Sequence, residues 1–90
     1  MDLVIQNNVM DEIVKERAKQ YVWWGDQRHD ISTWLVILME EVGEAAQAIF
    51  EHKYEDGDID GVRKELVHCA AVAIQIIENI DQDVIRKQEQ

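Results

Sequence analysis

The sequence predicts an all-α fold, a bundle of three main helices per chain that is completed by homo-oligomerisation. Apolar residues recur at helical spacing over three long segments, and no stretch of useful length alternates apolar and polar residues as a strand would. Proline is absent, and the glycines fall mainly where a helix would stop or turn. No repeat or linker divides the chain, so residues 1–90 are expected to form a single domain.

The first helix is expected to begin with Asn7 or Asn8 as its N-cap and to end at Gly25, because side-chain acceptors favour helix starts and glycine favours helix ends. Residues 1–6 are too short a segment to place. Residues 86–90 have nothing left to bury. Both terminal segments are therefore expected to be poorly ordered.

The second helix follows a polar loop. Asp30 or Ser32 can cap it, and it is expected to run to about Tyr54. A turn rich in acidic residues and glycine comes next, after which Asp58 can cap a third helix over residues 59–80.

An excess of apolar residues predicts self-association. Hydrophobic residues make up 47% of a chain of only 90 residues, which alone buries a limited share of its surface. From Leu66 to Ile77 only His68 and Gln75 are not apolar, so this helix is expected to be buried on nearly every side. The expected assembly is a homodimer or homotetramer.

The net charge of the chain disfavours two classes of partner. A net charge of -10 repels phosphate backbones and anionic lipid, so neither nucleic acid nor a membrane is expected as a partner. An anionic substrate would need a metal ion to bridge it. The single Cys69 suits a reducing compartment, although a small core residue is its more common role, and no signal peptide or spanning segment is evident. The expected location is cytoplasmic.

Two acidic groups stand within apolar helical pattern, in residues 40–44 (EEVGE) and, after a 20-residue spacer, in residues 65–68 (ELVH). Ionised carboxylates are costly in such surroundings unless a positive charge holds them together, and a metal ion is the favoured partner. In each group two side chains stand three positions apart, which puts them roughly 60° apart on one side of a helix. These pairs are Glu41 with Glu44 and Glu65 with His68.

A solvated acidic face is the alternative explanation for part of this pattern. It accounts for Glu40, Glu44 and Glu51, which lie on one polar stripe of the second helix. It accounts poorly for Glu41, which lies on the seam between the polar and apolar faces.

These motifs resemble a known family. Glu-Glu-x-Gly-Glu on one helix, followed at this spacing by Glu-x-x-Asp on the next, is the signature of the MazG-like, all-α nucleoside triphosphate pyrophosphohydrolases. The flanking segments 24–29 (WGDQRH) and 66–78 (LVHCAAVAIQIIE), together with Trp34, are similar to a compact branch that is often phage-borne or bacterial. The resemblance covers most of the chain.

The resemblance implies a Mg²⁺-dependent hydrolase that cleaves between the α and β phosphates and gives a nucleoside monophosphate and pyrophosphate. It also implies a dimer or tetramer. Transferred residue by residue, it makes Glu41, Glu44 and Glu65 metal ligands, with Glu40 and Glu41 as the catalytic candidates. Clustered carboxylates suit Mg²⁺, which takes oxygen ligands and substrate phosphates.

The chain departs from the family pattern at His68, where the family has Asp. Imidazole is a poor ligand for Mg²⁺ and a good one for Mn²⁺, Fe²⁺ or Zn²⁺. His68 is therefore either a ligand in an altered site, in which Mn²⁺ can replace Mg²⁺, or a neutral core histidine bonded to Glu65 or a carbonyl.

Other side chains could contact a substrate. Basic groups could reach phosphate oxygens, although ordinary solvated cations explain each one singly. Tryptophans could stack on a base, although a core or interface role is more common at helical spacing. The candidates are Lys53, Arg63 and Lys64 for phosphate, Trp23, Trp24 and Trp34 for a base, and Gln27 and His29 for a base or ribose.

Two other classes of function stay open. One is a catalytically degenerate homologue that acts as a helical assembly or interaction protein, with His68 marking the loss of the metal site. The other, ranked third, is a di-metal carboxylate protein, because Glu-x-x-His facing another glutamate-bearing helix is the ligand pattern of di-iron bundles. That site needs two such motifs, so a two-fold dimer would have to supply the second.

Overall fold

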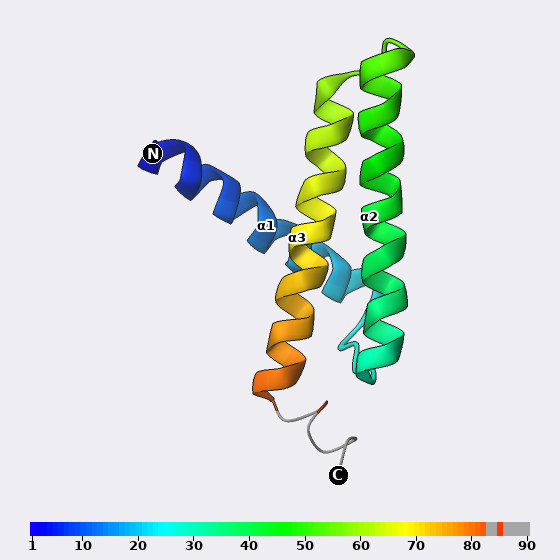
Figure 1. Cartoon of the computed structure of the whole chain (residues 1–90). Helices are drawn as coiled ribbons and strands as arrows, with labels where there is room; N and C mark the ends of the chain where they lie inside the picture. Colours follow the sequence, from blue (N-terminus) through cyan, green and yellow to red (C-terminus); the bar gives the residue numbers. More distant parts are fainter. Residues whose placement is uncertain (83–84, 86–90) are drawn as a thin grey trace.

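The computed structural model describes residues 1–82 and 85, which form three long helices (Figure 1). These are α1 (Leu3–Trp24), α2 (Ile31–Tyr54) and α3 (Ile59–Asp81). No strand occurs within those residues, so the predicted all-α class with three main helices is confirmed. None of these helices has the length and hydropathy needed to cross a membrane.

Helix α3 is the central element. It packs along α2 as an antiparallel hairpin and is crossed near its middle by α1, whose N-terminal half projects away from the hairpin (Figure 1). Between α1 and α2 there is little direct contact. Any site that combines all three helices must therefore form around α3.

Helix α1 begins earlier than the sequence indicates. The side chain of Asp2 accepts hydrogen bonds from the backbone N–H groups of Val4 (3.0 Å) and Ile5 (3.1 Å) and so caps the helix. The predicted N-cap at Asn7 or Asn8 was wrong, because Asp2 satisfies the first free amides one to two turns upstream. Residues 3–6 are the first turn of α1, whereas residues 86–90 lie outside the described part of the chain.

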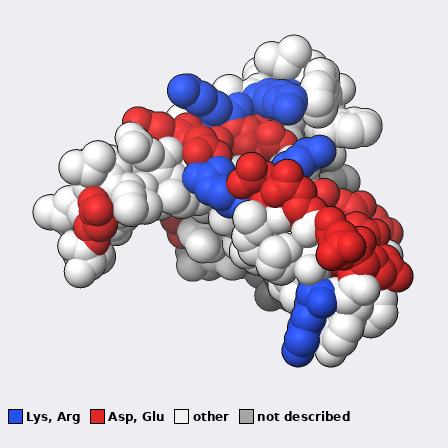
Figure 2. Space-filling model, turned by 90° about the horizontal axis from the view of Figure 1, so that it is seen from above, with Lys and Arg blue, Asp and Glu red and all other residues white. Residues whose placement is uncertain are grey.

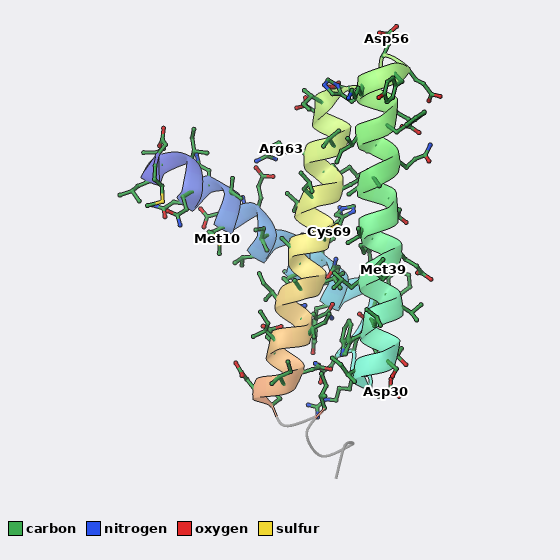
Figure 3. The ribbon with its side chains drawn as sticks, viewed as in Figure 1. Met10, Asp30, Met39, Asp56, Arg63 and Cys69 are labelled. Carbon is green, nitrogen blue, oxygen red and sulfur yellow. The ribbon has the colours of Figure 1, made fainter. Side chains whose placement is uncertain are left out.

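The caps of α2 and α3 are as predicted, with Asp30 accepting from Thr33 N (2.8 Å) and Asp58 accepting from Asp60 N (2.9 Å). Figure 3 shows Asp30 and Asp56 at opposite ends of α2. In the turn between the helices, a Cβ at Gly57 would lie 2.9 Å from backbone atoms of the end of α2. This close approach of backbone to backbone requires glycine at that position.

The hydrophobic core lies at the end of the hairpin away from this turn. Trp34 is fully buried and clusters with Val72 and Ile85, and four partly buried side chains pack against them. These four are Ile37, Leu38, Ile76 and Ile80. The indole Nε1 of Trp34 donates a hydrogen bond of 2.9 Å to Oδ1 of the buried Asn79. A buried indole N–H needs such an acceptor, so this bond fixes the first turn of α2 against the last turn of α3.

Helix α1 is held on α3 by two ion pairs on either side of the buried Ile13. Arg63 donates to both carboxylate oxygens of Glu12 at 2.7 Å, and Figure 3 shows Arg63 between the two helices. Arg17 pairs with Glu78 further along. A bidentate arginine pair fixes orientation as well as distance, so these contacts set where the side chains of α1 meet α3.

The burial of α3 differs in part from the expectation. Ala71, Val72 and Gln75 are buried, but Leu66 and Ile77 are 50% and 56% exposed in the isolated chain. Helix α3 therefore has one open apolar side. A longer apolar stripe is exposed on α2, on the flank next to its contact with α3. It comprises Leu35, Met39, Val42, Ala46 and Ile49.

Candidate metal site

Three of the four predicted metal-binding residues meet where α2 and α3 face each other. Glu41 of α2 and Glu65 and His68 of α3 each place one ligand atom so that all of these atoms lie within 4.8 Å of one another. All three residues are partly buried. The one-turn spacing of Glu65 and His68 puts both on the same side of α3, and the antiparallel hairpin brings Glu41 to them.

Two carboxylate oxygens in this group are buried without a donor. Oε2 of Glu41 and Oε2 of Glu65 are shielded from solvent and have no hydrogen-bond partner in the described part of the chain. Nδ1 of His68 approaches Glu65 Oε2 at 3.4 Å, which is beyond the usual range of an N–H···O bond. Buried anionic oxygens without a donor are costly, and a bound cation would remove that cost.

The electrostatic surroundings of Glu41 also disfavour its ionised carboxylate. Burial of its carboxyl and the negative charges of Glu44, Glu65 and Glu16 raise its pKa, and His68 opposes the shift. A raised carboxyl pKa means that the ionised form is disfavoured where it stands. The cluster therefore carries more negative charge than its surroundings stabilise.

Glu44, the fourth predicted ligand, lies beside this group and not within it. It is exposed and lines a groove of about 620 Å³ together with Glu40, Gln47, Glu51 and Glu65. Glu40, predicted to act in catalysis, is exposed on the same groove. Both residues thus lie next to the metal candidates through Glu65, and their roles stay predictions.

A further carboxylate comes from α1. Oε1 of Glu16 lies 3.2 Å from Nε2 of His68, and the Glu16 side chain is only 11% exposed. Sequence reasoning missed this residue, because it examined the two motif-bearing helices alone. Nothing in the local sequence around Glu16 indicates the contact, which depends on where α1 crosses α3.

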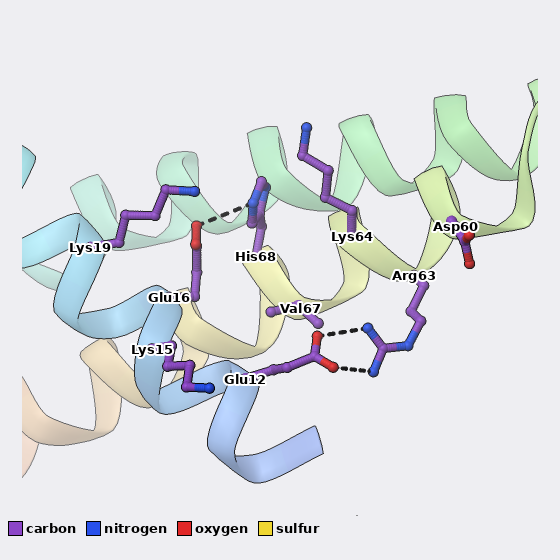
Figure 4. Close-up of a pocket in the computed structure, with 9 residues that line it drawn as sticks. All are labelled: Glu12, Lys15, Glu16, Lys19, Asp60, Arg63, Lys64, Val67 and His68. Atoms are coloured by element: carbon purple, nitrogen blue, oxygen red, sulfur yellow. Dashed lines mark hydrogen bonds and ion pairs between the residues drawn. The ribbon is translucent and has the colours of Figure 1, made fainter. Parts of the chain in front are cut away.

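A groove of about 440 Å³ lies between α1 and α3 and has His68 in its wall (Figure 4). Basic side chains line it from both helices, and Figure 2 shows Lys and Arg side chains interleaved with acidic ones over the middle of the molecule. The basic residues are Lys15, Lys19, Arg63 and Lys64. Three acidic residues share the groove, namely Glu12, Glu16 and Asp60.

Of the three residues predicted to contact phosphate, two line this groove and one does not. Lys64 and Arg63 do line this groove, but Arg63 is occupied by Glu12. Lys53 does not line it and instead lies over the ring of Tyr54, at 5.3 Å from its centroid. Lys15 and Lys19 were missed, because their participation again depends on the crossing of α1.

A third hollow, of about 220 Å³, has Glu41 in its wall. Glutamine amides are the most numerous groups in its wall, in which Gln75 Nε2 donates to Gln27 Oε1 (3.2 Å) and Gln20 Oε1 is buried without a partner in the described chain. The lining residues are Gln20, Trp24, Gln27, Ile37, Glu41, Val72 and Gln75.

The structure also gives the positions of the tryptophans and of His29, which were candidates for contact with a base or ribose. Trp34 is a core residue, which is the alternative that the sequence left open, so it offers no face to a base. Trp23 and Trp24 are more than 60% exposed. His29 packs edge-on against Trp34, with 4.9 Å between ring centroids.

Comparisons with family models, curated proteins and solved structures give no match to this chain. The resemblance to the MazG-like family therefore depends on the motifs and their spacing.

Proposed function

We propose that this chain is a MazG-like, metal-dependent nucleoside triphosphate pyrophosphohydrolase, which cleaves between the α and β phosphates to give a nucleoside monophosphate and pyrophosphate. The observation that carries the proposal is the convergence of Glu41, Glu65 and His68, with two buried carboxylate oxygens that lack a donor. Two carboxylates and an imidazole fit Mn²⁺ well and Mg²⁺ through the oxygens.

In this proposal Glu41, Glu65 and His68 hold the metal ion. When bound, the ion supplies positive charge that stabilises the phosphoryl oxygens as the anhydride bond breaks. Glu44 and Glu40, on the adjoining groove, hold the attacking water and accept its proton. Their exposure gives that water access from solvent.

The groove between α1 and α3 suits the polyphosphate. Four of the nine Lys and Arg residues of an otherwise strongly acidic chain line it, and three of these four are lysines. Ammonium groups bind phosphate oxygens as flexible point charges. Because His68 stands in the groove wall, phosphates lying there would reach the metal ligands directly.

The hollow lined by glutamine amides suits the nucleoside. Amide groups present donors and acceptors to the edge of a base, and Trp24 adds an aromatic face. Each of the three hollows shares one residue with the metal candidates: His68 with the basic groove, Glu65 with the acidic groove and Glu41 with the amide-lined hollow. A nucleotide can thus extend across the site from base to terminal phosphate.

A panel of nucleoside triphosphates, assayed for pyrophosphate release with Mg²⁺ and with Mn²⁺, tests the proposal. Glu41→Gln is expected to abolish release, whereas Glu55→Gln, in the exposed turn after α2, serves as the matched control. Lys19→Ala and Lys64→Ala are expected to raise KM with a smaller effect on kcat. Absence of release from the wild type with every nucleotide and both metals would contradict it.

A second proposal, homo-oligomerisation, is favoured by the exposed stripe on α2. Leu35, Met39, Val42, Ala46 and Ile49 follow one another at alternating steps of four and three residues. This spacing is typical of a helix seam that packs against another helix. A second copy of the chain would cover it and complete the bundle, whether the protein is an enzyme or a degenerate homologue that acts as an assembly protein.

A further inference from the structure

The two ring nitrogens of His68 contact two different carboxylates. Nε2 lies 3.2 Å from Oε1 of Glu16, on α1, whereas Nδ1 lies 3.4 Å from Oε2 of Glu65, on α3 itself. Glu65 belongs to the group of converging ligand atoms with Glu41. Glu16 stands outside that group, and Figure 4 shows its carboxylate directed at the His68 ring.

These distances bear on which tautomer is present. A neutral imidazole has one N–H donor and one lone pair, and the contact made by one nitrogen favours one form over the other. The contact of Nε2 with Glu16 Oε1 is the shorter of the two, at 3.2 Å against 3.4 Å, so Nε2 is the better-placed donor of a neutral ring. In that tautomer the lone pair of Nδ1 lies on the side of Glu65.

We propose that Glu16 is a positioning residue that holds His68 in this tautomer, so that Nδ1 serves as a ligand to a metal ion bound with Glu41 and Glu65. The inference rests on the metal site of the proposed function. It explains how the chain can carry histidine where the family motif has Asp: a carboxylate from a third helix makes the imidazole a competent ligand. Carboxylate–histidine–metal arrangements of this kind orient the ring and raise its basicity.

The surroundings of Glu16 suit this role. Its side chain is almost fully covered, and α1 is paired with α3 one turn before it, through Glu12–Arg63, and at the next residue, through Arg17–Glu78. Lys19 and Lys64 line the same groove as Glu16.

The inference predicts a metal preference. An imidazole nitrogen with two carboxylates favours Mn²⁺ or Zn²⁺ over Mg²⁺. Calorimetry on the wild type should show tighter binding of Mn²⁺ than of Mg²⁺. Glu16→Ala should weaken Mn²⁺ binding by about 10- to 100-fold, the usual effect of losing such a partner. Glu16→Gln should weaken it less, because the amide oxygen still accepts from Nε2–H.

Two further variants separate positioning from simple charge. Asp11→Asn removes one negative charge from an exposed position of the same helix and should leave Mn²⁺ affinity unchanged. In a His68→Asp background, Glu16→Ala should no longer weaken metal binding, because no imidazole remains to be oriented. Circular dichroism of each variant confirms that it is folded.

Nitrogen NMR of the His68 ring gives a readout that does not depend on activity. The metal-free wild type should show a protonated Nε2 and an unprotonated Nδ1, and diamagnetic Zn²⁺ should shift the Nδ1 resonance. In Glu16→Ala the two tautomers should mix. An imidazolium that bridges Glu16 and Glu65 and persists in the presence of metal would overturn the inference.

Equal losses of Mn²⁺ affinity on Glu16→Ala in the His68 and His68→Asp backgrounds would also overturn it, because they would reflect long-range charge alone. The result is separable from that for the hydrolase. If the protein releases pyrophosphate but Glu16→Ala does not change its metal affinity, the hydrolase proposal holds and this inference is wrong. If Mn²⁺ binding depends on Glu16 but no nucleotide gives pyrophosphate, this inference holds and the hydrolase proposal is wrong.

Discussion

The indole N–H of Trp34 donates a hydrogen bond of 2.9 Å to Oδ1 of Asn79, and both residues are almost completely buried. The same Asn79 Oδ1 lies 3.4 Å from the backbone N of His29, and its Nδ2 lies 3.4 Å from the carbonyl oxygen of Gln27. One amide group therefore joins the core to the loop before α2. That loop supplies Gln27 to the amide-lined hollow.

Asn79→Ala is expected to destabilise the protein by about 1–3 kcal/mol, because it leaves the buried indole N–H of Trp34 without an acceptor. Urea unfolding measures this change. Gln82→Ala, on the exposed residue after α3, is the control and should change stability little. If the two variants were equally stable, the buried hydrogen bond would not contribute significantly to the free energy of unfolding.

Removing the charge of Glu41 is expected to stabilise the metal-free protein at neutral pH. Burial and neighbouring carboxylates raise the pKa of Glu41, so the folded state binds this proton more tightly than the unfolded state does. Stability is therefore lost as pH rises from the ordinary glutamate pKa through the raised one. Glu41→Gln should gain on the order of 0.5 kcal/mol above that window, similar to relief of a like-charge pair, and nothing below it.

Thermal unfolding in EDTA across pH 3 to 8 measures this gain, with Glu55→Gln as the matched exposed control. Adding Mn²⁺ should then raise the melting temperature of the wild type by mass action and leave Glu41→Gln nearly unaffected. If neither Mg²⁺ nor Mn²⁺ raises the melting temperature of the wild type while Glu41→Gln alone is stabilising, the cluster binds no metal. That result would favour the alternative of a degenerate homologue that acts as an assembly protein.

Cys69 offers an independent report on the site. The thiol is partly buried, and this burial together with the charges of Glu41, Glu65 and Glu44 raises its pKa. Alkylation by iodoacetamide should be slower than in the unfolded chain, because the thiolate is the reacting form. A divalent cation bound by Glu41 and Glu65 would offset those charges, so Mn²⁺ should accelerate alkylation of the wild type and leave the rate for Glu41→Gln unchanged. An unaltered wild-type rate at saturating Mn²⁺ would place the cation elsewhere.

His68→Asp is expected to move the metal preference from Mn²⁺ toward Mg²⁺, because it replaces a nitrogen ligand by an oxygen ligand at the position where the family motif has Asp. Pyrophosphate release with Mg²⁺ should rise by about tenfold, a change as large as the smaller ones caused by altering the partners that orient metal ligands. Rate and melting temperature are measured on the same variant. A loss of stability without any gain in rate would mark His68 as a structural histidine.

Val42→Glu is expected to dissociate the assembly, because it places a charge in the middle of the exposed apolar stripe of α2. Light scattering after size exclusion should report a dimer or tetramer for the wild type and a monomer for the variant. Val22→Glu is the matched control, since Val22 is 79% exposed on α1 and lies outside the stripe. A wild type that is monomeric at micromolar concentration would exclude this mode of assembly.

Features encoded by neighbouring residues could be predicted from the sequence. Asp30 and Asp58 were identified as caps because each side chain binds an amide two or three residues away. The same local rule failed at Asn7 and Asn8, since Asp2 stands further upstream and caps the helix first.

The candidate site likewise contains residues that the sequence could identify and a residue that it could not. Glu65 and His68 share one side of α3 by helix geometry alone, and Glu41 joins them because α2 and α3 form a short-turn hairpin. Glu16 lies on a helix that meets α3 only through tertiary contacts, and no pattern along the chain encodes its contact with His68. The exclusion of Glu44 from the converging atoms likewise depends on the rotation of α2 about its axis.

Helix α1 touches little besides α3, yet it carries Glu16, Lys15 and Lys19 into the basic groove. Its contacts with α3 include the buried Ile13, two arginine–glutamate ion pairs and the Glu16–His68 contact, whereas α2 and α3 share the Trp34 cluster. Regions with few buried apolar contacts open at a lower free energy than the rest of a protein. Detachment of this single helix would remove the groove while the α2–α3 hairpin stays folded. If the groove binds the polyphosphate as proposed, the fraction of molecules competent to bind it is set by the docking equilibrium of α1, and amide hydrogen exchange along α1 measures that equilibrium directly.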